Sequence, residues 1–135
     1  MSEYKTIGEV RAEACLEAFH RAMRENPGKP IAELMRIAAA MPAPRFFVEP
    51  PMAKKCVALL RNHGKKVKNP NKAAMYAELY RRWKNMRVDG YSVLEEIICE
   101  PAPSFYLHPQ RFTTIVYETL RKNKKRNNGK DKKND

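Results

Sequence analysis

The chain has 135 residues, 43% of them hydrophobic and 31% charged, which is normal for a globular protein and leaves enough apolar material for a core. No apolar run approaches the roughly 18 residues needed to cross a bilayer, and the first residues lack the basic-then-apolar order of a secretory signal. We therefore expect a cytoplasmic protein without membrane contacts, whose formal net charge of +12 favours polyanionic partners.

Three helices are predicted in the first half of the chain. Apolar residues at three- and four-residue steps predict a helix over residues 9–25, and Asn26-Pro27-Gly28 ends it. A second helix is predicted over about 30–40, before Pro42-Ala43-Pro44, which cannot continue it. A short third helix follows over about 51–62.

The helical pattern then restarts after a polar, basic segment. Residues 63–71 are predicted to form a linker, followed by helices over 72–86, 92–99 and 109–122. The last residues, from 122 onward, include no apolar side chain, so the sequence predicts a disordered basic tail over 124–135.

One motif occurs twice with the same helix order around it. Residues 41–50 and 100–109 share the pattern PAPxF(F/Y) at an offset of 59. We therefore predict an all-α protein of two tandem helical repeats, each with three to four helices, that pack together. The predicted organisation is repeat 1 (9–62), basic linker (63–71), repeat 2 (72–123) and disordered basic tail (124–135).

Each PAPxF(F/Y) segment is predicted to make a tight corner between helices. The first proline would halt one helix and the second would begin a short helix that carries the aromatic pair. At least one aromatic residue of each pair is expected in the core, and we predict Phe46 and Phe105 to be buried at equivalent positions.

This order of elements resembles the DNA-binding head of tetracycline-repressor-type regulators, a homeodomain-like helix-turn-helix. The matching stretches are helices 31–40 and 92–99, corners 41–43 and 100–102, short segments 44–48 and 103–108, and helices 52–60 and 111–120. The family usually has a glycine in the turn and a serine or threonine cap, where this chain has Met-Pro-Ala and Glu-Pro-Ala. The resemblance implies that the two short segments are DNA-recognition helices.

The positive charge is concentrated in two segments. Residues 61–72 have five basic and no acidic side chains, and residues 121–135 have eight basic and two acidic ones. Such segments favour sequence-independent contacts to phosphates. The candidate nucleic-acid-binding residues come from these two segments, from the predicted recognition helices and from the helices that follow them. They are Arg45, Lys54, Lys55, Lys65, Lys66, Lys68, Ser104, His108, Arg111, Lys124, Lys125 and Arg126.

Catalytic and metal sites are not expected. The chain has no nucleophile elbow, glycine-rich phosphate loop or HExxH motif. Cys15, Cys56 and Cys99 are widely spaced and lie at no metal-ligand spacing from a histidine, so we expect buried free thiols and neither metal nor cofactor.

Two functional hypotheses follow. The first is a nucleic-acid-binding protein, a small regulator or accessory factor that contacts duplex DNA through the basic linker and tail. The second is a non-enzymatic helical adaptor that binds a protein partner or forms a homo-oligomer, with a tail that only solubilises it. Basic side chains gathered on one face favour nucleic acid, whereas scattered ones around an exposed apolar groove favour the adaptor.

Overall fold

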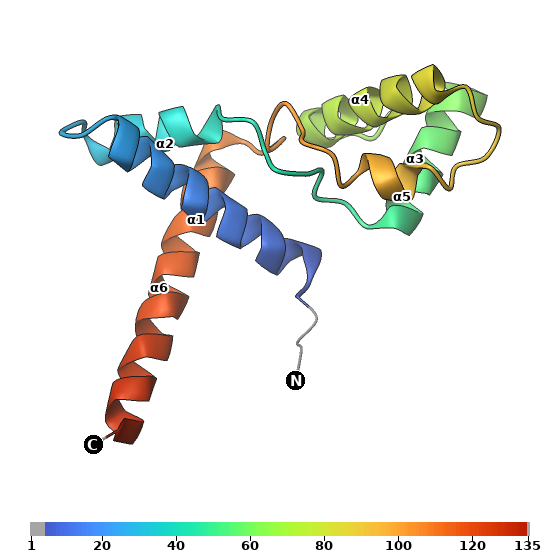
Figure 1. Ribbon diagram of the computed structural model, residues 1–135. Coiled ribbons are helices and arrows are strands. Elements are labelled where there is room, and N and C mark those ends of the chain that lie inside the picture. The colour runs from blue at the N-terminus through green and yellow to red at the C-terminus, as the bar shows by residue number, and fades with distance from the viewer. Residues whose placement is uncertain (1–4, 135) are drawn as a thin grey trace. The chain divides into compact units, whose positions relative to one another are not determined.

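The computed structural model describes the backbone of residues 5–134 and the side chains of residues 5–126. This part of the chain folds into six helices without a strand, which confirms the all-α prediction (Figure 1). None of the described helices is both long and apolar enough to cross a membrane. The helices belong to two compact units, one made of Met1–Met41 with His108–Asp135 and the other of Pro42–Leu107.

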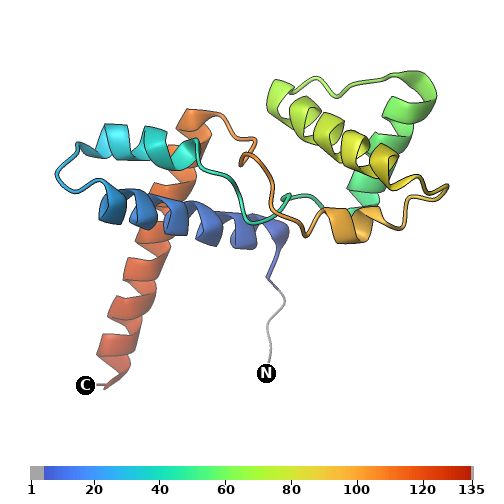
Figure 2. The same cartoon turned by 45° about the horizontal axis from the view of Figure 1, so that its top comes forward.

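The first unit contains three helices, α1 (Ile7–Glu25), α2 (Ile31–Ala39) and α6 (Pro109–Asn134). The α1 and α2 helices run in opposite directions side by side, and α6 crosses them (Figures 1 and 2). Apolar residues at helical spacing face one another from all three helices. The buried residues are Cys15, Ala18, Phe19 and Ala22 of α1, Leu34, Met35 and Ala38 of α2, and Phe112, Ile115 and Val116 of α6.

Short-range hydrogen bonds fix both ends of α1. The Thr6 side chain accepts a hydrogen bond from the Glu9 backbone N–H at 3.1 Å, which satisfies one of the free donors of the first turn. At the other end, the Asn26 backbone and side-chain N–H groups both donate to Ala22 O. Gly28 then adopts φ +85°, a conformation that glycine takes at low cost.

The second unit contains α3 (Pro50–His63), α4 (Pro70–Met86) and the short α5 (Leu94–Ile97), and each of the three contacts the other two. The Trp83 indole N–H donates to Gly90 O at 2.9 Å and so ties the turn after α4 to the helix. Buried side chains come from the helices and from both PAPxF(F/Y) segments. They are Ala43, Phe46, Val48, Ala53, Cys56, Val57, Met75, Tyr76, Leu79, Trp83, Leu94, Ile97, Ile98, Ala102 and Phe105.

The helix positions agree with the sequence predictions to within a few residues, except at the carboxyl end. There α6 continues to Asn134, over a segment that the sequence predicts to be disordered from residue 124. Lysine and arginine are good helix formers, and a helix that its packed first turns have already nucleated adds further residues at little cost.

The short helices predicted at the two corners are wrong, because residues 44–48 and 103–108 are not helical. Ala43 and Ala102 instead exchange two backbone hydrogen bonds of 2.9 Å. Each alanine precedes a proline, which disfavours the helical conformation, and the neighbouring prolines have no N–H to donate. An extended alanine with an unused N–H and C=O therefore pairs with the alanine of the other corner.

The aromatic pairs of the two corners stack on one another. Phe46 lies on Tyr106 with ring centroids 6.2 Å apart, and Phe47 lies on Phe105 at 6.0 Å. The predicted burial of Phe46 and Phe105 is confirmed, with exposed fractions of 1% and 5%. The corners are thus part of the core of the second unit, although they contain no regular structure.

The compact units differ in sequence range from the predicted repeats. The first unit takes α1 and α2 from the first half of the chain and α6 from its end. The second takes α3 from the first half together with α4 and α5 from the second half. Each unit therefore contains two successive helices of one predicted repeat and the last helix of the other, and the repeat itself stays a prediction.

An arginine pair on α4 sets the charge of Glu78. Hydrogen bonds from Arg81 and Arg82 of 2.7–2.9 Å hold the pKa of Glu78 at about 2, below its usual 4.5. The charged form therefore stabilises the fold above pH 4.5, and this contribution is lost as the pH falls from 4.5 towards 2. Glu78→Gln should have a lower urea midpoint than the wild type at pH 7, and the difference should narrow below pH 4.5 and vanish at about pH 2. Parallel loss of stability in both proteins would contradict this assignment.

Candidate nucleic-acid interface

The predicted basic linker is a short, ordered connection between two helices of the same unit, α3 and α4. Gly64 ends α3 with φ +62°, and the N–H groups of Gly64 and Lys65 donate to Leu60 O and Leu59 O. Five residues later the Asn69 side chain accepts a hydrogen bond from Lys72 N–H at 3.0 Å and begins α4. Both ends of the connection are therefore fixed by caps.

The lysines in and directly after this connection are exposed, and no acidic side chain among the described residues pairs with them. Lys65, Lys66, Lys68 and Lys72 all lie at the surface, and within the described residues no side chain forms an ion pair or hydrogen bond with their ammonium groups. The first turn of α4 contains no acidic residue, so its amino end adds partial positive charge beside them. The fold thus places three lysines on the connection and Lys72 in the first turn of α4, next to the amino terminus of that helix.

Other predicted site residues of this unit already have partners inside it. Arg45 donates from Nε to Phe46 O at 3.0 Å, and Lys54 forms an ion pair with Glu95 at 3.5 Å. Ser104 accepts a hydrogen bond from Tyr106 N–H at 2.9 Å. These three side chains thus have partners within the protein, whereas Lys55 is exposed on α3.

In the first unit, His108 begins α6, where its Nδ1 accepts a hydrogen bond from Gln110 N–H at 3.1 Å. Arg111 and Arg126 both line an open hollow of about 480 Å³ between α1 and α6. Lys124 and Lys125 are exposed on the same helix. The hollow is also lined by Arg11, which the sequence pattern did not single out and whose buried Nε atom has no hydrogen-bond partner in the part of the chain that the structure describes.

Arg61 is a second residue that sequence reasoning left out of the candidate set. Its guanidinium lies over the Trp83 ring at 5.2 Å and donates to the Tyr91 hydroxyl at 3.2 Å. Trp83 also stacks between Tyr80 and Tyr91, with ring centroids 6.0 and 5.1 Å away. The contact joins α3 to α4 and to the turn before α5, so no local pattern in the sequence could have indicated it.

The cysteines follow the sequence expectation in part. Cys15 and Cys56 are buried, as predicted, but Cys99 is exposed because it follows α5 on its outer side. Burial raises the pKa of the Cys15 thiol to about 12, although Arg11 partly offsets this effect. Over the described residues, no three histidine, cysteine or acidic side chains come together in a group that could hold a metal ion.

Comparison with known proteins identifies no relative of this chain. No family model, curated protein or solved structure matches the chain.

Proposed function

We propose that the protein binds nucleic acid, with duplex DNA as the first ligand to test, through contacts to the phosphate backbone. The observation that carries this proposal is the connection between α3 and α4 with the first turn of α4, where Lys65, Lys66, Lys68 and Lys72 are exposed and have no acidic partner among the described residues. Seven other cations are instead paired with acidic side chains of the protein. Ion pairs of 2.6–3.5 Å occupy Lys5, Arg21, Arg24, Lys29, Lys54, Arg81 and Arg82.

The proposed contacts position the protein on phosphates and do not read bases. The segments expected to be recognition helices, 44–48 and 103–108, are not helical and bury Phe46, Val48 and Phe105, so they offer no helix for the major groove. Lys124, Lys125 and Arg126, which are exposed on α6, would supply a second set of phosphate contacts. Binding should therefore be independent of DNA sequence.

Fluorescence anisotropy with two labelled duplexes of unrelated sequence tests this proposal. The proposed contacts, four at the connection and α4 and three on α6, predict that affinity falls on the order of several thousandfold between 50 and 200 mM salt, equally for both duplexes. Duplex RNA and single-stranded DNA, titrated in parallel, establish which backbone is preferred. Absence of binding to all of these at 50 mM salt would overturn the proposal and leave the adaptor hypothesis.

A further inference from the structure

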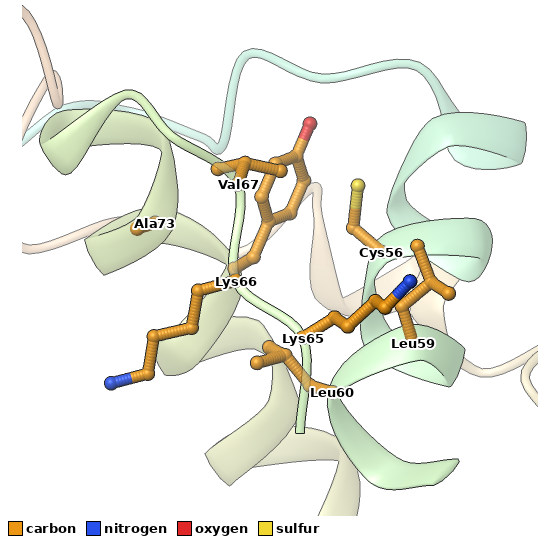
Figure 3. A pocket seen from close by; sticks show the side chains of 8 residues that line it. Cys56, Leu59, Leu60, Lys65, Lys66, Val67 and Ala73 are labelled. Carbon is orange, nitrogen blue, oxygen red and sulfur yellow. The ribbon is translucent and has the colours of Figure 1, made fainter. Parts of the chain in front are cut away.

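A small apolar cavity lies beneath the connection that carries the lysines. It has a volume of about 130 Å³ and lies between the end of α3, residues 65–67 and the beginning of α4 (Figure 3). The lining side chains are Cys56, Leu59 and Leu60 of α3, Lys65, Lys66 and Val67 of the connection, and Ala73 and Tyr76 of α4.

The local sequence explains why this space is left open. The chain turns back at Gly64 and passes over both helices, where only Val67 is a half-buried apolar residue of the connection. Opposite it stands Ala73, whose methyl group is too small to fill the gap between α3 and α4. The connection has lysines at positions 65 and 66, where apolar side chains would cover the space. Figure 3 shows the side chains of Lys65 and Lys66 extending from the chain in opposite directions.

The walls and the mouth of the cavity differ in chemistry. The walls are aliphatic apart from the Cys56 thiol and the Tyr76 ring, both of them buried. Burial, with a smaller contribution from neighbouring Cys56, raises the pKa of Tyr76 to about 12, so its phenol is neutral at pH 7. The charged residues of the lining are Lys65 and Lys66, and neither ammonium group has an acidic partner within the described residues.

We propose that this cavity binds a small amphipathic anion, a single apolar ring that carries a carboxylate. An apolar cavity of about 150 Å³ holds a benzene molecule, so the volume here fits one ring and no larger group. A carboxylate on the ring would reach Lys65 or Lys66 at the mouth, where a charge-assisted hydrogen bond orients the ligand. This site shares Lys65 and Lys66 with the proposed nucleic-acid interface, but its test contains no nucleic acid, so either proposal can fail without the other.

Benzoate is the probe for the full-length protein, followed by two-dimensional amide NMR. Saturable shifts are expected at residues 56–67 and 73–76. Benzyl alcohol, which keeps the ring, and acetate, which keeps the carboxylate, should each bind at least tenfold more weakly. Equal binding of benzoate and acetate, or no shifts at these residues, would overturn the proposal.

Substitutions that fill the cavity or remove its charge provide the matched controls. Ala73→Leu should weaken benzoate binding at least tenfold, whereas Ala77→Leu, an exposed position one turn later on α4, should not. Lys65→Gln and Lys66→Gln should weaken benzoate but leave benzyl alcohol unchanged. Lys68→Gln lies on the same connection outside the cavity lining and should affect neither. Benzoate binding that survives Ala73→Leu unchanged would contradict the site.

A readout on the wild-type chain avoids any folding defect of the variants. Benzoate in the cavity should slow alkylation of Cys56, quantified by mass spectrometry of its peptide, by the factor that the NMR affinity predicts. Cys15, which is buried in the other unit, serves as the internal control and should react at the same rate with and without benzoate. An unprotected Cys56 at saturating benzoate would contradict the proposal.

Discussion

Phe46→Ala is expected to lower the free energy of unfolding of the second unit by about 3–5 kcal/mol, the usual cost of deleting a buried aromatic ring. The Phe46 side chain is 1% exposed. Its ring stacks on Tyr106 and lies beneath the Arg82 guanidinium, which is 4.8 Å from the ring centroid. The backbone hydrogen bond from Phe46 N–H to Ile98 O at 2.9 Å does not depend on the ring, so the variant tests packing alone.

Urea unfolding followed by Trp83 fluorescence measures this loss, because the single tryptophan lies in the same unit as Phe46. Met86→Ala is the control, since Met86 is 50% exposed at the end of α4 and its truncation should change stability by no more than about 0.5 kcal/mol. A loss below about 1 kcal/mol for Phe46→Ala would show that the corner is not part of the core.

Replacing Lys65, Lys66, Lys68 and Lys72 together with glutamine is expected to weaken duplex DNA binding on the order of a hundredfold near 0.1 M salt. Each phosphate contact that is lost should also reduce the slope of log affinity against log salt by about one. Because these side chains are exposed and unpaired in the described structure, the urea midpoint should change little. Anisotropy titrations at several salt concentrations give both quantities.

The control removes the same charge elsewhere. Arg21, Arg24, Lys29 and Lys84 are exposed, and changing them to glutamine lowers the net charge equally without touching the connection. This variant should lose only severalfold in affinity. Deleting residues 122–135 should weaken binding tenfold or more, since it removes the second set of proposed contacts. If the deletion abolishes binding while the variant with glutamine at Lys65, Lys66, Lys68 and Lys72 binds like the wild type, the connection is not the interface.

Sequence patterns predicted the helices well because their signals are local. Apolar spacing of three and four residues marked all six helices, and prolines and glycines such as Pro27, Gly28 and Pro50 marked several of their ends. The burial of Phe46 and Phe105 was also predictable, since an aromatic pair beside a proline corner has few ways to avoid the core.

The corners show where local reasoning failed. The two prolines of each PAP segment are compatible with the start of a short helix, and only the presence of a second identical segment makes an extended conformation more favourable. Ala43 and Ala102 satisfy each other's backbone groups across 59 residues of chain, and the aromatic rings follow them into contact.

Local patterns in the chain predict an all-α protein, roughly where each helix lies, and a concentration of positive charge between residues 61 and 72 and near the carboxyl end. Which helices form each compact unit, which cations are paired, as Lys54 is with Glu95, and the cavity lined by Lys65 and Lys66 follow from the three-dimensional packing. The reason is the range of the interactions. Helix periodicity and caps depend on residues within one or two turns, whereas ion pairs, cavities and unit composition depend on which distant side chains meet.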